Sequence, residues 1–191
     1  MVFDTIFFMR YIAKRYLQDE EAIEATKSIL ENAEEENILQ VYIDRSFSSR
    51  ERSFIRNLIQ DTDDIIGLDF EFTNNKNRAD INFSQVGNFR KGELGYTGIN
   101  HNDQWDVVIN RNQSSSDKRW SIVHQLGYAL GLENPSDDYD GDYFVTRNAF
   151  SIRGATSDDT VMSFKQGRKS YDPSFWTAND QDALVSIWGT S

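Results

Sequence analysis

Apolar residues recur along this chain of 191 residues with two different spacings, which separate helical from extended segments. Up to residue 37 the spacing is three and four residues, as in amphipathic helices. It predicts two N-terminal helices, the second beginning at the acidic run 19–21, where negative charge favours a helix N-terminus. A second acidic run, 34–36, lies near the expected end of that helix and predicts fraying. The recurring positions are Ile6, Met9, Ile12, Ala13 and Tyr16 in the first helix and Ala22, Ile23, Thr26 and Ile29 in the second.

From residue 38 the apolar pattern changes to short runs and alternation, which predict strands. A helix is expected between the first two strands, because Ser48 and Glu51 form a capping signal ahead of apolar positions at helical spacing. The five predicted strands are 38–43, 68–72, 79–83, 93–97 and 105–109.

Two further helices are expected in the second half of the chain. The first covers residues 117–130, where apolar positions again follow helical spacing. Residues 131–176 read as a loop. Thr177 and Asp180 then resemble a capping box that begins a final helix, which Gly189 can end.

Composition narrows the class of protein. Lys and Arg number 20 against 31 Asp and Glu, and the net charge of −11 argues against nucleic acid or an anionic membrane as the main partner. Aromatic residues make up 13% of the chain, enough to build a core. The absence of cysteine excludes disulfides and thiolate metal sites. We expect no N-terminal signal peptide and no transmembrane segment, because no apolar run is long enough, and the compartment stays open.

The most informative segment is residues 124–135, with the sequence HQLGYALGLENP. It resembles a degenerate copy of the metzincin zinc-protease motif H-E-x-x-H-x-x-G-x-x-H, in the serralysin and matrixin style in which a proline often follows the third histidine. In the intact motif two histidines four residues apart on a helix bind one zinc ion, and a third histidine after a glycine turn completes the site. The glutamate is the general base for zinc-bound water.

Most of the chemical positions of that motif are replaced in this chain. His124 stands at the first ligand position. Gln125 replaces the general base, Tyr128 the second histidine and Asn134 the third. A phenol with a pKa of about 10 binds zinc poorly, a neutral amide is a weak ligand, and a glutamine cannot accept a proton. We therefore predict no zinc cofactor and no peptidase activity.

Two further segments resemble the same family. Residues 159–164, DTVMSF, are similar to the Met-turn, and Met162 matches the methionine that lies beneath the metal in that family. Residues 176–189 resemble its C-terminal helix. The order of the elements predicted before the motif helix is also the metzincin order, so the resemblance spans about Ile38 to Gly189.

The resemblance implies an α+β fold: a metzincin-like domain with a twisted mixed five-stranded sheet, a backing helix, the motif helix and a small C-terminal helical part. Two N-terminal helices precede it. We predict two regions, an N-terminal helical extension over residues 1–37 and a metallopeptidase-fold domain over residues 38–191.

Three functions are compatible with these residues. The first is an inactive pseudo-peptidase that acts as a binding or structural module for a protein or peptide partner, with an extended ligand added at the sheet edge. The second is a structural subunit of a larger assembly, such as a virus particle, in which the N-terminal helices support oligomerisation. The third is a zinc metalloendopeptidase with unusual ligands, in which His101, Glu133 or Asp137 joins His124. Otherwise His101 faces solvent and His124 is hydrogen-bonded within the old cleft, for instance to Tyr128.

An acidic loop follows the motif. Asp138, Asp140 and Asp142 alternate around a glycine, and oxygens in this arrangement can bind calcium. The loop is shorter than an EF-hand and lacks its last, bidentate glutamate. The sequence leaves two interpretations open, a calcium site and a solvated acidic turn.

Overall fold

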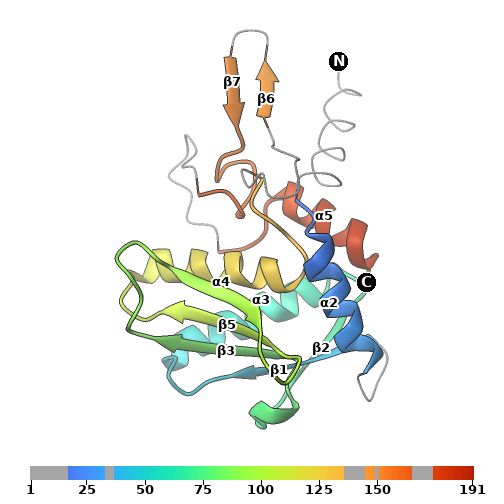
Figure 1. The fold of residues 1–191 in the computed structure, drawn as a ribbon, viewed down its shortest axis with the longest axis vertical. Coiled ribbons are helices and arrows are strands. Elements are labelled where there is room, and N and C mark those ends of the chain that lie inside the picture. Colours follow the sequence, from blue (N-terminus) through green and yellow to red (C-terminus); the bar gives the residue numbers. More distant parts are fainter. Residues whose placement is uncertain (1–16, 33–36, 136–144, 149–150, 165–173) are drawn as a thin grey trace.

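The computed structural model describes residues 17–32, 37–135, 145–148, 151–164 and 174–191. The chain forms a mixed five-stranded sheet with helices packed against it, so the predicted α+β class is confirmed (Figure 1). The strands lie in the order β2-β1-β3-β5-β4, in which only β4, at one edge, runs antiparallel to its neighbour. The strands are β1 Ile38–Ile43, β2 Asp69–Phe72, β3 Ile81–Val86, β4 Gly95–Ile99 and β5 Trp105–Asn110.

All five predicted strands form, but β3 and β4 each begin two residues later than predicted. Ahead of β3, the Asp80 carboxylate accepts a hydrogen bond from the Gln40 main-chain N–H (2.7 Å), so a side chain replaces a ladder partner there. Ahead of β4, Glu93 closes a turn with Arg90: its N–H donates to the Arg90 carbonyl and its carboxylate accepts from the Arg90 N–H. Local side-chain bonds of this kind compete with strand pairing, and alternation alone does not reveal them.

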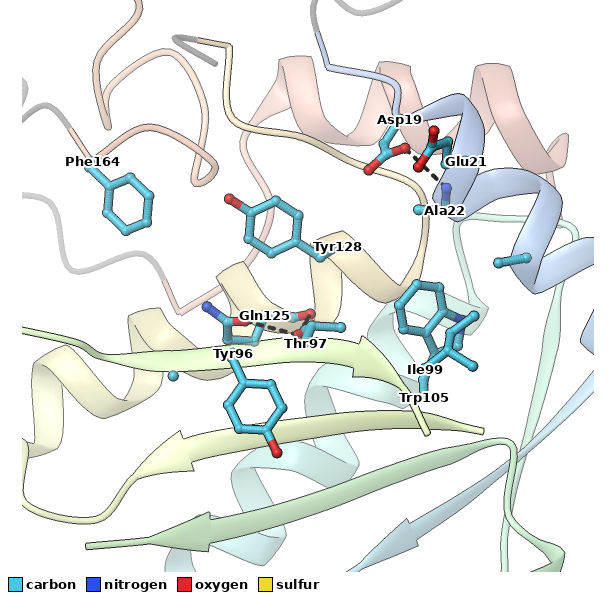
Figure 2. Close-up of a pocket in the computed structure, with 12 residues that line it drawn as sticks. Asp19, Glu21, Ala22, Tyr96, Thr97, Ile99, Trp105, Gln125, Tyr128 and Phe164 are labelled. Atoms are coloured by element: carbon cyan, nitrogen blue, oxygen red, sulfur yellow. Dashed lines mark hydrogen bonds between the residues drawn. The ribbon is translucent and has the colours of Figure 1, made fainter. Parts of the chain in front are cut away.

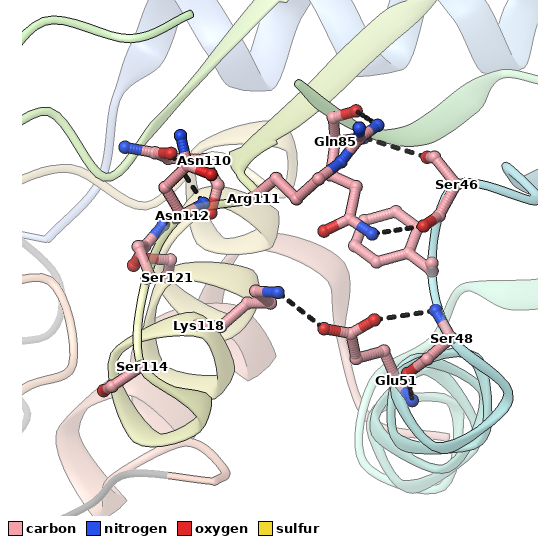
Figure 3. Close-up of polar contacts among 12 residues, drawn as sticks. Ser46, Ser48, Glu51, Gln85, Asn110, Arg111, Asn112, Ser114, Lys118 and Ser121 are labelled. Carbon is pink, nitrogen blue, oxygen red and sulfur yellow. Dashed lines mark hydrogen bonds and ion pairs between the residues drawn. The ribbon is translucent and has the colours of Figure 1, made fainter. Parts of the chain in front are cut away.

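Helices α3 (Ser49–Asp63) and α4 (Ser115–Ala129) pack beside each other against the sheet. The predicted capping box of Ser48 and Glu51 is present at the start of α3. Figure 3 shows that Glu51 also forms a partly buried ion pair with Lys118 of α4, with 2.7 Å between Nζ and Oε1, which joins the two helices. Helix α4 begins two residues earlier than predicted because Ser114 caps it.

The hydrophobic core lies between the sheet and these helices. Alternate residues of the central strands point into it, as the alternation predicted. Its fully buried members include Leu39, Val41, Ile55, Ile59, Ile81, Phe83, Val107, Ile109, Ile122, Val123 and Leu126.

The predicted loop over residues 131–176 is wrong in part. Strands β6 (Val145–Asn148) and β7 (Ser151–Gly154) pair antiparallel within it, and the hairpin extends away from the main sheet (Figure 1). Each strand has four residues and few apolar ones, too short a pattern for alternation to register. The final helix, α5 (Ala178–Trp188), has the predicted capping box of Thr177 and Asp180, and Gly189 ends it.

Helix α2 (Glu20–Glu31) is the second predicted N-terminal helix, and its acidic first turn is confirmed. It ends at Glu31, short of the acidic run 34–36, which lies outside the described residues, as does the first predicted helix. Thr26 ties α2 to the rest of the molecule. Its buried hydroxyl donates to the Ala129 carbonyl of α4 and accepts from Nε1 of Trp105 on β5, both at 2.9 Å. These contacts place α2 in the same core as the sheet.

Candidate functional site

Helix α4 places His124 at the centre of the candidate site. The imidazole is fully buried, and Nδ1 lies 2.9 Å from the main-chain carbonyl of Val161. A carbonyl only accepts hydrogen bonds, so Nδ1 carries the proton and Nε2 is a free lone pair. Among the described residues, Nε2 has no hydrogen-bond partner. The predicted alternative of a histidine bonded within the old cleft holds, with Val161 as the partner instead of Tyr128.

Three aromatic rings surround this imidazole. The ring centroids of Trp120 and Phe164 lie 4.6 Å and 4.7 Å from that of His124. Tyr128, one helical turn along, packs edge-on at 5.0 Å with an interplanar angle of 86°. These contacts replace polar surroundings with apolar ones and separate Nε2 from water.

Burial lowers the pKa of His124 from its usual 6.5 to about 4, and the hydrogen bond to the Val161 carbonyl opposes this shift. A charged imidazole in this position would bring a second N–H with no acceptor. His124 is therefore neutral at physiological pH.

We expect this histidine to make folding pH-dependent. The unfolded imidazole takes up a proton below its usual pKa of 6.5, and the folded one resists until about pH 4. Stability that is complete above pH 6.5 is then lost as the pH falls, by about 2 kcal/mol between pH 7 and pH 5. Urea unfolding of the natural protein and His124→Gln at several pH values measures the effect, because glutamine can still donate to Val161 and does not titrate. Equal pH slopes for the two proteins would contradict the prediction.

The segment with Met162 lies directly against α4. A Cβ built on Gly127 of the helix would come within 2.6 Å of the Met162 sulfur, so glycine permits the close approach. The neighbouring Val161 supplies the carbonyl that orients His124. The structure thus brings together the motif helix and the Met-turn-like segment.

Asp180, at the start of α5, holds this segment in place. Its fully buried carboxylate accepts from the Val161 N–H (3.0 Å), the Thr177 N–H (2.9 Å) and the hydroxyls of Thr160 and Thr177. Burial raises the pKa of the Asp180 carboxyl, and these donors oppose the rise. The sequence pattern predicts this residue only as a helix cap.

Gln125, at the position of the general base, is held by the edge strand. The Thr97 hydroxyl lies 2.9 Å from its side-chain Oε1 and 2.8 Å from its main-chain carbonyl oxygen. The residue is 5% exposed. In the described part of the chain, its Nε2 has no hydrogen-bond partner.

A cavity of about 550 Å³ lies between β4, α2 and α4 (Figure 2). Gln125 and Tyr128 line it from α4, and Thr97 and Ile99 line it from β4. His124 is not among the lining residues, because Tyr128 and Phe164 stand at the cavity wall. Tyr128 therefore covers the histidine without filling the cleft.

Among the described residues, the donors around His124 do not fit zinc. Its one imidazole nitrogen faces aromatic rings, and the residue at the second ligand position, Tyr128, presents a ring edge to it. No group of three or more His, Asp, Glu or Cys side chains in the described ranges is arranged to hold a metal ion. Zinc sites need three or four such donors converging on one point.

The remaining predicted residues lie in loops and turns or outside the described residues. Asn134 is half-buried after Gly131, a turn glycine with φ of +85° whose added Cβ would meet Ile23 of α2. His101 is exposed in the turn between β4 and β5, as the solvent-facing alternative expected. The calcium candidates Asp138, Asp140 and Asp142, and Asp137 beside them, lie outside the described residues.

No family model matches the sequence, and no curated protein matches it. Among solved structures, two of myroilysin, a metallopeptidase, resemble this chain with a TM-score of 0.51. The chain has a metallopeptidase-like fold. The first is 13% identical, and the match covers 79% of this chain and 92% of that one; for the second the values are 12%, 79% and 82%. At this identity the likeness concerns the fold alone.

Several residues of the site could not be predicted from the sequence. Thr97 is one of them, because its contact with Gln125 depends on how β4 lies over α4. Trp120 and Phe164 also belong to the site, and their contact with His124 has no signal in the sequence. Helix α2 was not expected to line the cleft.

No helix in the described ranges is both long and apolar enough to span a membrane.

Proposed function

We propose that this protein is catalytically inactive despite its metallopeptidase-like fold. In this proposal it binds an extended peptide segment of a partner protein along β4. The observation that carries the proposal is the outer edge of β4, which pairs with no further strand in the described part of the chain and borders the cavity beside Gln125. An unpaired strand edge is a template for adding another strand, and a peptide ligand adds in this way in several protein families.

The pairing of β4 with β5 indicates which main-chain groups of β4 are free. Asn110 N donates to the Leu94 carbonyl, and Asn100 N donates to the Gln104 carbonyl. Hydrogen-bonded pairs alternate along an antiparallel ladder, so even-numbered residues of β4 face β5. Residues 95, 97 and 99 then direct their N–H and C=O groups outward, where a peptide can pair with them.

Gln125 complements this edge. Thr97 holds one end of its carboxamide, and the other end borders the cavity with no partner among the described residues. A peptide unit has both a carbonyl and an N–H, so it satisfies a carboxamide in either orientation. In this proposal the residue at the general-base position has become a ligand-binding residue.

The same residues disfavour catalysis. A glutamine carboxamide cannot take a proton from water, and His124 Nε2 is enclosed by aromatic rings. Peptide hydrolysis on this scaffold requires an activated water and an electrophile, and the residues present are suited to neither. Binding without cleavage is the function that remains for the cleft.

Selection from a random linear peptide library, followed by affinity measurement, tests the proposal. Ile99→Pro removes one N–H that points away from β5, so no hydrogen bond between β4 and β5 is lost. Ile99→Ala is the matched control that keeps this N–H. We expect selected peptides to bind Ile99→Pro at least roughly tenfold more weakly than Ile99→Ala, since one main-chain hydrogen bond and the fit of the neighbouring residues are lost.

N-methylation of the selected peptide provides a second readout. A strand added to β4 directs every second N–H toward it, so methylation should weaken binding at alternate positions only. A peptide that binds Ile99→Pro and Ile99→Ala equally, with no alternation on methylation, would show that the β4 edge is not the binding surface. Intact ligand after long incubation is also expected.

A further inference from the structure

We infer that the cleft selects peptide segments with a lysine or arginine whose aliphatic stem packs on apolar residues and whose charge meets Asp19 and Glu21 of α2. This inference rests on the proposed function and adds the chemistry of the partner. The relevant wall of the cavity is formed by Asp19 and the first turns of α2 (Figure 2).

Among the described residues, the charge on the cavity wall has a single sign. Asp19 and Glu21 are the two charged residues of this part of the wall, and no cationic side chain in the described ranges lines it. Neither carboxylate has an ion-pair partner among the salt bridges of the described residues. Their fields therefore favour a cationic group that enters the cleft.

The acidic wall is held in position. The Asp19 carboxylate accepts from the Ala22 N–H (3.0 Å) as the N-cap of α2, and the Asp19 N–H donates to the Gly131 carbonyl (2.9 Å). Thr26, two turns along, bonds to α4 and β5. A rigid anchor lowers the entropic cost of pairing these carboxylates with a ligand charge.

Apolar residues continue from the acidic wall to β4. Ala22 and Ala25 of α2 line the cavity together with Ile99 and Trp105. The described part of the chain has four exposed large hydrophobic residues, and three of them, Tyr96, Ile99 and Phe164, line this cavity. A lysine or arginine suits such a surface, because its methylene stem covers apolar atoms while the head reaches a carboxylate.

The Gln125 carboxamide distinguishes a peptide from a simple cation. This side chain is nine-tenths buried or more and borders the same cavity; its Oε1 lies 2.9 Å from the Thr97 hydroxyl, and its Nε2 has no acceptor among the described residues. A metal ion bound to Asp19 and Glu21 would offer that donor no acceptor. A peptide satisfies it with a backbone carbonyl while its basic side chain reaches α2.

The experiment compares charge variants that preserve the fold. Asp19→Asn with Glu21→Gln removes both charges, and asparagine is as good an N-cap as aspartate. Glu20→Gln with Glu24→Gln is the control, because these exposed residues of the same helix do not line the cavity. The peptide library is screened in the presence of EDTA, and each selected peptide is also made with norleucine for lysine or citrulline for arginine.

We expect a basic residue at one fixed position of the selected peptides. The natural protein should bind the neutral analogue about tenfold more weakly than the basic peptide. The Asp19→Asn, Glu21→Gln variant should bind the two peptides equally. The control variant should behave like the natural protein. Peptides that bind along β4 without a basic residue would overturn this inference and leave the proposed function intact. A library that yields no peptide would overturn both.

Discussion

The triple variant Gln125→Glu, Tyr128→His, Asn134→His is expected to retain about one zinc ion per chain after dialysis, whereas the natural protein retains none. Residues 124 and 128 lie four apart on α4, so two histidines there share one helix face. Val161 already fixes the His124 tautomer with Nε2 as the lone pair that a metal requires. Phe164, 58% exposed, is the ring best able to move aside for the ion.

Elemental analysis of the two purified proteins measures this difference. His124→Ala in the triple variant is the control and should abolish zinc retention, since it removes the one ligand that the natural chain keeps. Zinc retained by the natural protein and lost in its own His124→Ala variant would contradict the prediction and revive the unusual-ligand peptidase. Structural zinc sites bind the metal with a free energy of about 10 kcal/mol or more, so we expect zinc retention to be either nearly complete or absent.

Asp180→Ala is expected to lower the free energy of unfolding by about 3–5 kcal/mol. The substitution leaves the Thr160 hydroxyl and the Val161 and Thr177 N–H groups without the acceptor they share. It also removes the capping box of α5. The segment around Val161, whose carbonyl orients His124, also loses its hydrogen bonds to Asp180 of α5.

Urea unfolding measures the loss, and Asp182→Ala, an exposed position of the same helix, is the control. Asp180→Asn should be nearly as destabilising as Asp180→Ala, because its NH₂ group would face a donor wherever it points. A loss below about 1 kcal/mol for Asp180→Ala would mean that other groups take over these hydrogen bonds.

Local signals determined much of the fold in advance. Strand β1 has the predicted bounds because its alternation reflects one face buried against α3 and α4. The capping boxes at Ser48 and Thr177 were readable because such boxes involve residues three positions apart. The motif around His124 was readable for the same reason, since ligands on one helix keep a fixed spacing.

The cleft was decided by contacts between distant segments. Asp19, Thr97 and Gln125 line one cavity, although Thr97 precedes Gln125 by 28 positions and Asp19 precedes it by 106. No periodicity in the sequence predicts such a contact. The sequence by itself determined the elements, their caps and the residue types at the motif positions, because these depend on neighbours along the chain. Only the tertiary structure decided that Gln125 borders an open strand edge and that α2 adds an acidic wall, because packing across the core brings these groups together.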